Sequence, residues 1–144
     1  MNTKKYVLDT SVIIDKEISK MLQTGKIVED SEIIIPRAVL DELQAQASTS
    51  RDQGLVGLQE IHDIREVCSK KSIKIKFSGE RPHYDDILLA KHGRIDSIIN
   101  ELAFKENAIL ITGDYVQHLA AQAQGIDSVF IKYNNKITHF KFEK

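Results

Sequence analysis

Residues 108–125, AILITGDYVQHLAAQAQG, decide the fold class of this chain. They begin with a short β-branched run at Ile109–Ile111, continue through a polar turn, and then carry apolar residues at helical spacing from Tyr115 to Ala123. Gly125 follows as a candidate C-cap. A short strand that leads directly into a helix is typical of proteins built around a parallel sheet.

The same alternation of strand and helix continues on both sides of this segment. The predicted strands are Tyr6–Leu8, Ile33–Ile35, Ile73–Phe77, Ile109–Ile111 and Val129–Ile131. Helical spacing predicts helices that begin near Pro36, line one face over Leu55–Cys68, and run from Ile95 to Phe104. Strands that alternate with helices form parallel sheets with both faces covered. We therefore expect an α/β domain of three layers.

Polar segments predict where the chain turns at the surface. Ser48–Gly54 (STSRDQG) and Ser78–His83 (SGERPH) are predicted loops, and the second leads into a predicted helix at Tyr84–His92. The 144 residues suit one compact domain, which we expect to cover residues 1–133.

The final residues carry a separate signal. The pair Asn134-Asn135 lies between two strand-like runs, which predicts a terminal hairpin that closes on Ile137–Phe142. Residues 134–144 are therefore expected to form a hairpin strand or the start of a linker to a following domain.

Composition and charge narrow the class of protein. A formal net charge of -1 argues against a strongly basic nucleic-acid binder, but not against an enzyme that meets phosphates through bound cations. The single Cys68 excludes an internal disulfide and a thiolate zinc cage, and it favours a reducing cytoplasm. No stretch approaches the roughly 20 apolar residues of a membrane helix, so we expect no membrane partner.

Two acidic residues are distinguished by their position. Asp9 directly follows the apolar run YVL, and Asp114 follows AILITG, so both are expected at the carboxyl ends of buried parallel strands. Ligands of open α/β sheets bind at that edge. Carboxylates brought together there repel unless protons or a cation neutralise them, and Mg²⁺ favours carboxylate oxygens. The alternative for each residue is that it caps the following helix.

Two further acids are expected near the same edge. The helix after Ile33–Ile35 carries both Asp41 and Glu42, and helical geometry alone does not choose between them. Asp96 lies near the start of a predicted helix, where capping is again the alternative. Three residues could orient a carboxylate or contact substrate: Ser11, Thr112 and Arg94.

Four segments together resemble the motifs of PIN domains. They are VLDTSVIID at 7–15, IIIPRAVLDEL at 33–43, GRIDSIINELA at 93–103 and LITGD at 110–114, in the family's order and over nearly the whole chain. Within the family, GLVGLQEIHDIRE at 54–66 and GERPHYDDILLAKHGRID at 79–96 are most similar to the amino-terminal PIN domain of archaeal PIN–KH ATPases, which is related to bacterial PIN–TRAM proteins.

This resemblance carries specific expectations. It implies a sheet ordered 3-2-1-4-5, and a Mg²⁺ or Mn²⁺ site and catalytic centre formed by Asp9, Glu42, Asp96 and Asp114, with Glu42 preferred over Asp41. It implies a metal-dependent nuclease that hydrolyses RNA, or possibly single-stranded DNA. It also implies a homo-oligomer and fused KH and ATPase domains, although no GxxxxGK[ST] phosphate loop occurs in this chain. The alternative is a catalytically silent PIN module that serves oligomerisation or partner binding.

Other candidate residues favour ordinary structural roles. The five histidines (His62, His83, His92, His118 and His139) show no metal-ligand spacing and are interpreted as isolated surface residues. Cys68 lies on the apolar face of its predicted helix and is expected in the core. The basic run of Lys70, Lys71, Lys74 and Lys76 could follow phosphates, but it is more typical of a solvated flank.

Overall fold

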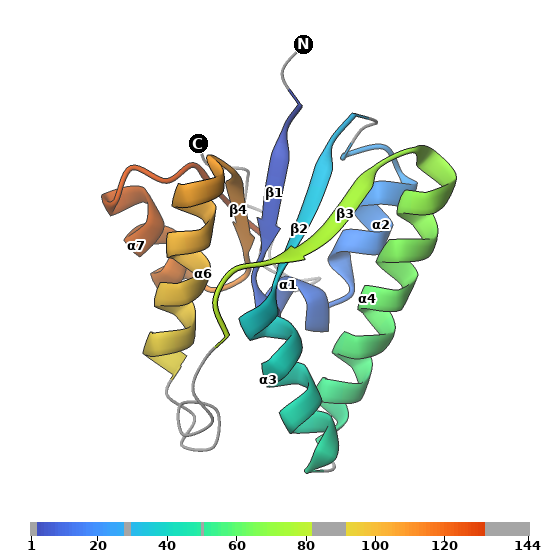
Figure 1. Ribbon diagram of the computed structural model, residues 1–144, viewed down its shortest axis with the longest axis horizontal. Helices are drawn as coiled ribbons and strands as arrows, with labels where there is room; N and C mark the ends of the chain where they lie inside the picture. Colours follow the sequence, from blue (N-terminus) through green and yellow to red (C-terminus); the bar gives the residue numbers. More distant parts are fainter. Residues whose placement is uncertain (1–2, 28–29, 50, 82–91, 132–144) are drawn as a thin grey trace.

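A computed structural model of the chain describes residues 3–27, 30–49, 51–81 and 92–131, without the side chains of residues 92–94. Five strands form one sheet in the order β3-β2-β1-β4-β5, which confirms the predicted order (Figure 1). Every neighbouring pair is parallel. The strands are β1 (Lys5–Leu8), β2 (Glu32–Pro36), β3 (Lys74–Ser78), β4 (Ile109–Thr112) and β5 (Ser128–Phe130).

Helices cover both faces of this sheet. They are α1 (Thr10–Ile14), α2 (Glu17–Gln23), α3 (Arg37–Ser48), α4 (Asp52–Lys71), α6 (His92–Glu106) and α7 (Tyr115–Ala123). Helix α6 contacts β1 and β4 while α7 contacts β4 and β5, whereas α4 packs on β3 and against α1, α2 and α3 (Figure 1). The sequence did not predict α1 and α2, because helices of five and seven residues are too short to show a clear period.

The central strands are buried on both sides, as expected for a parallel sheet between two helical layers. Consecutive residues Ile33, Ile34 and Ile35 of β2 are all 0% exposed. None of the described helices is long and apolar enough to span a bilayer.

The register of β1 and β4 positions the candidate site. Leu8 pairs with Ile111, so Asp9, directly after β1, lies beside Thr112, the last residue of β4, at the carboxyl edge of the sheet. The backbone N–H of Asp9 also donates to the carbonyl oxygen of Ile111 at 3.0 Å. This is the point where the strand order reverses, since β1 continues toward β2 on one side and pairs with β4 on the other.

The predicted loop Ser48–Gly54 is wrong in length. Helix α3 continues through Ser48 and α4 already begins at Asp52. Gly54 lies inside the first turn of α4, where a β-carbon would come 2.3 Å from the backbone nitrogen of Ala47. The glycine therefore allows two helices to approach closely. Its polar neighbours are the reason that the sequence predicts a loop there.

Smaller differences concern element ends. Strand β5 begins and ends one residue before its predicted position, and β3 is displaced by one residue the other way. Helix α6 begins at His92, which places Asp96 inside the helix and excludes the capping alternative for it. The predicted helix Tyr84–His92, apart from His92, and the hairpin on Ile137–Phe142 lie outside the described residues.

Candidate active site

Asp9 is the most buried of the four predicted acids. It follows β1 and is only 4% exposed. Its Oδ2 accepts hydrogen bonds from the hydroxyls of Ser11 and Thr112, both at 2.8 Å. Burial raises the pKa of this carboxyl group, the hydrogen bonds from Ser11, Thr112 and the backbone of Thr10 oppose that rise, and the charge of Asp114 adds to it.

The two hydroxyls that contact Asp9 are themselves held by the turn after β4. Thr112 Oγ1 accepts from the backbone N–H of Asp114 at 3.0 Å, and Ser11 Oγ accepts from the N–H of Gly113 at 2.8 Å. Each hydroxyl therefore accepts from this turn and donates to Asp9. The orientation of the Asp9 carboxylate is thus fixed from two chain segments.

Glu42 and Asp41 are separated by the structure. Glu42 is 8% exposed and accepts a hydrogen bond from Thr10 Oγ1 at 2.8 Å, next to Asp9 in the chain. Asp41 instead forms an ion pair with Arg81, with 3.8 Å between Nε and Oδ2. The neighbouring carboxyl groups thus point to different surroundings, and Glu42 is the one that reaches the edge of β1.

Asp96 is the acid whose pKa responds to the charges of the other three. It is half-buried on α6, and its pKa is raised to about 7, first by burial and then by the charges of Asp9, Asp114 and Glu42. These groups are carried by the end of β1, by α3, by α6 and by the turn after β4. Figure 1 shows α3 beginning near the end of β1 and α6 running alongside β4. Four distant segments therefore bring negative charge to one place.

Asp114 combines exposure with a capping role. Its Oδ1 accepts from the backbone N–H of Val116 at 3.0 Å and of Gln117 at 3.3 Å, so it caps α7. The capping alternative therefore holds for Asp114, whereas Asp9 occupies the N-cap position of α1 without a side-chain capping bond. Both capping bonds of Asp114 fall on one oxygen.

The donor set fits a hard divalent cation. Its groups are carboxylates supported by hydroxyls, and Mg²⁺ and Mn²⁺ prefer oxygen ligands. Within residues 3–27, 30–49, 51–81 and 92–131, no three acidic, histidine or cysteine side chains form a preassembled metal site.

Two buried amides at this cluster were missed by the sequence reasoning. Gln117 on α7 is 3% exposed and Asn100 on α6 is 4% exposed, with 3.1 Å between their terminal amides. Asn100 lies one helical turn after Asp96, and Gln117 lies three residues after Asp114. That spacing on the same helices was the available signal.

Other expectations about charged and polar residues need correction. His118 is not a surface residue: it is 1% exposed, its Nδ1 lies 2.8 Å from Ser128 Oγ, and its ring packs near Tyr115 and Phe130. Its burial arises because α7 lies on β5.

Cys68 is in the core as expected, and burial raises the pKa of its thiol to about 11. The side chain of Arg94 lies outside the described residues.

The basic run does not lie at the acidic edge. Lys74 opens β3 and pairs in register with Glu32 at the start of β2, which is the opposite edge of the sheet. Lys71 Nζ donates to the carbonyl oxygens of Leu22 and Gln23, and Lys76 forms ion pairs with Glu32 and Glu106. Lys71 and Lys76 thus have structural partners.

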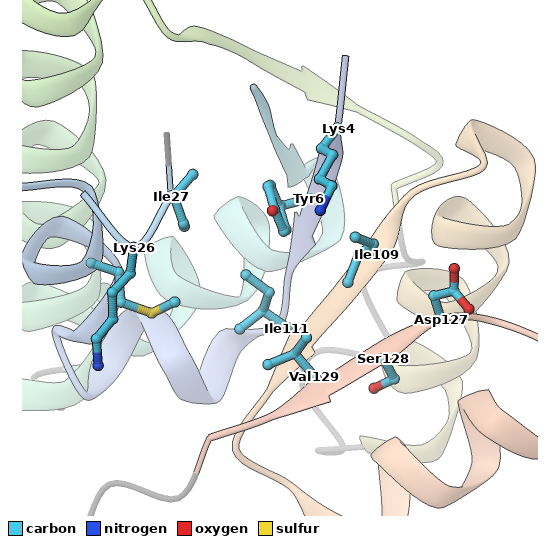
Figure 2. Close-up of a pocket in the computed structure, with 10 residues that line it drawn as sticks. Lys4, Tyr6, Lys26, Ile27, Ile109, Ile111, Asp127, Ser128 and Val129 are labelled. Carbon is cyan, nitrogen blue, oxygen red and sulfur yellow. The ribbon is translucent and has the colours of Figure 1, made fainter. Parts of the chain in front are cut away.

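A pocket of about 540 Å³ also lies away from the four acids. It is formed on the sheet face beside α2, and Figure 2 shows its wall of strand residues from β1, β4 and β5. Its lining residues are Lys4, Tyr6, Met21, Lys26, Ile27, Ile109, Ile111, Asp127, Ser128 and Val129. We place the chemistry at the carboxyl edge rather than here, because the pocket wall is mainly apolar and lacks a group of acids.

The stability of the metal-free protein should depend on the protonation of Asp96. Its folded pKa of about 7 exceeds the ordinary value of about 3.9, so folding favours the protonated form. This contribution is full below about pH 4 and is lost as pH rises through about 7. In EDTA, the melting temperature should therefore fall between about pH 5 and 8, and Asp96→Asn should reduce that slope. Equal slopes in the two proteins would contradict the assignment.

Comparisons with known proteins agree on one family. The PIN domain family profile matches residues 6–123. An uncharacterized KH and PIN-domain containing protein of Methanocaldococcus jannaschii is 42% identical over 129 residues, which cover 90% of this chain and 20% of that protein. A solved domain of a functionally unknown protein from the same organism superposes with a TM-score of 0.87 at 38% identity, covering 98% of this chain and 100% of that one.

Bacterial relatives extend the comparison. Uncharacterized PIN and TRAM-domain containing proteins of Synechocystis and Bacillus subtilis are 36% and 31% identical over 124 and 127 residues. These matches cover 83% and 85% of this chain but 31% of each relative. The chain thus corresponds to one part of longer proteins that carry a KH or a TRAM domain as well, in agreement with the narrower resemblance seen in the sequence.

Proposed function

Because this chain belongs to the PIN-domain family, whose members are generally metal-dependent nucleases, we propose that it hydrolyses phosphodiester bonds in RNA with Mg²⁺ or Mn²⁺. The observation that carries the proposal is the electrostatic interaction among the carboxyl groups of Asp9, Glu42, Asp96 and Asp114. These carboxyl groups come from four chain segments, yet the pKa of Asp96 responds to each of the other three. Concentrated negative charge of this kind favours a divalent cation.

Each acid is proposed to have a distinct role. Asp9, Asp96 and Asp114 would hold the cation directly, and Glu42 would hold a second ion or orient the attacking water. A bound divalent cation neutralises charge on a phosphate and makes water a better nucleophile at neutral pH. Thr112 and Ser11 would keep the Asp9 carboxylate in one orientation through their 2.8 Å hydrogen bonds.

RNA is the proposed substrate class because one relative combines its PIN domain with a KH domain. A chain of net charge -1 offers phosphates little attraction, since sequence-independent affinity comes mainly from lysine and arginine. We propose that fusion to a nucleic-acid-binding domain and assembly into a homo-oligomer, in the cytoplasm, would supply the missing affinity by avidity.

Cleavage of an end-labelled single-stranded RNA tests this function. We expect shortened products with Mn²⁺ or Mg²⁺ and none with EDTA. A single-stranded DNA tested in parallel shows whether cleavage requires ribose. The comparison should use the chain alone and the chain within its longer protein. A longer protein that binds RNA but leaves it intact with either cation would contradict the proposal and favour a catalytically silent module.

A further inference from the structure

The terminal amide of Gln117 lies between two of the proposed metal ligands. One of its polar atoms is 3.1 Å from Oδ2 and 3.2 Å from Oδ1 of Asp9, and 3.3 Å from Oδ1 of Asp96. The side chain is 3% exposed, so this amide is almost fully removed from water. A buried amide is costly unless its polar atoms find partners, which makes its orientation informative.

The surroundings decide which end of the amide faces the carboxylates. When Asp9 and Asp96 are ionised, their oxygens only accept hydrogen bonds, so the NH₂ group of Gln117 then points toward them. The amide oxygen of Gln117 then lies 3.1 Å from the Asn100 atom assigned as Oδ1, so the Asn100 amide turns with it and donates from its NH₂ group. Asn100 is 4% exposed and belongs to the same helix as Asp96.

We propose that Gln117 is a positioning residue for the metal ligands. Its NH₂ group joins the carboxylate of Asp9, at the end of β1, to that of Asp96, on α6, and Asn100 holds the amide in the required orientation. The inference rests on the proposed function, because it takes Asp9 and Asp96 to be cation ligands.

A neutral donor suits this place better than a charged one. Two carboxylates repel when no cation lies between them, and a shared NH₂ group offers one hydrogen to each without cancelling their charge. A lysine or arginine at this position would offset the negative charge that attracts the cation. With Gln117, the relative position of Asp9 and Asp96 is set before the cation arrives, and the attraction for it remains.

The substitution Gln117→Met tests this role, since it keeps the length of the side chain and removes both polar atoms. Partners of metal ligands typically change metal affinity by about 10- to 100-fold when they are lost, and we expect the Kd for Mn²⁺ to rise by that factor. Gln59→Met is the matched control, because Gln59 donates to Asp63 at 3.2 Å on the exposed side of α4. Its Kd should stay within about twofold of the wild type.

Asn100→Leu provides a second variant. We expect a smaller rise in Kd, and little additional rise when Asn100→Leu is combined with Gln117→Met, because both changes interrupt the same chain of hydrogen bonds. Calorimetric titration with Mn²⁺ gives each Kd, and the melting temperature in EDTA and in Mn²⁺ shows whether the variants fold. A lower melting temperature with an unchanged Kd would mean that Gln117 only packs, and would overturn the proposal.

A measurement on the wild type removes the dependence on folded variants. In NMR spectra, the side-chain NH₂ protons of Gln117 should exchange slowly with water and shift when Mg²⁺ is added. Rapid exchange, or no shift on metal binding, would overturn the positioning role while leaving the proposed function intact. If the wild type binds no Mn²⁺, the proposed function fails and this inference fails with it.

Discussion

Asp9→Asn should lower the rate of Mn²⁺-dependent RNA cleavage by about a thousandfold. A cation contributes several kcal/mol of charge stabilisation in such reactions, and loss of about 4 kcal/mol corresponds to that factor. Asp9 is neither a solvated surface charge nor a helix cap with a side-chain bond, because it is 4% exposed and makes no side-chain capping bond. The amide keeps its size and can still accept from Ser11 and Thr112, so the fold should be retained.

Asp41→Asn is the control for this change. Asp41 precedes Glu42 in the chain but pairs with Arg81. The rate of RNA cleavage by the Asp41→Asn variant should therefore remain within about twofold of the wild type. A second readout separates binding from chemistry. Mn²⁺ should raise the melting temperature of the wild type by mass action, and Asp9→Asn should remove most of that rise. Retained cleavage together with a retained Mn²⁺ response would exclude Asp9 as a ligand.

Without metal, Asp9→Asn is expected to change stability in the opposite direction from its effect in Mn²⁺. Burial is the largest influence on Asp9 and leaves its pKa raised, so the ionised form is less favourable in the folded chain than in water. Removing the charge should therefore keep or raise the melting temperature in EDTA. A variant that is less stable without metal would show that the charge strengthens its hydrogen bonds by more than burial costs.

Gly54→Ala should lower the free energy of unfolding by about 3 kcal/mol. Helix propensity alone would favour alanine by about 1 kcal/mol, because Gly54 lies inside α4. The added β-carbon, however, would lie 2.3 Å from the backbone nitrogen of Ala47 and 2.6 Å from the carbonyl oxygen of Leu43. Backbone atoms of a packed helix cannot move aside as a side chain can, so α3 and α4 must separate.

Two neighbouring substitutions make this test specific. At Gly57 the new β-carbon would meet the side chain of Leu43, which can change rotamer, so Gly57→Ala should cost less than Gly54→Ala. Gln53 is exposed in the same helical turn, and Gln53→Ala should change the free energy of unfolding by less than about 0.5 kcal/mol. Urea unfolding measures all three. A Gly54→Ala variant more stable than the wild type would contradict the close packing of α3 on α4.

The sequence by itself determined the strand–helix alternation and the location of the acids along it. Runs such as Ile33–Ile35 and Ile109–Ile111 are apolar because they lie between two helical layers, and that burial is visible in any single segment. Asp9 follows such a run directly, and Asp114 follows one after Thr112 and Gly113, so their position at the carboxyl edge depends only on local order. The strand order itself was implied by resemblance to a family rather than by local pattern.

Only the tertiary structure decided which polar residues meet. Asp41 and Glu42 are adjacent in the chain, but Glu42 accepts from Thr10 while Asp41 pairs with Arg81. Gln117 was not among the residues predicted for the site, yet its amide lies between Asp9 and Asp96, which precede it by 108 and 21 positions.

Gly54 and His118 show the same limit of local pattern. Gly54 was mistaken for the end of a loop, and His118 for a surface residue, because the sequence does not record which element will pack against each position. Local periodicity reports the face that a segment buries. Contacts between side chains far apart in the chain depend on how complete helices and strands pack, and that information exists only in the assembled fold.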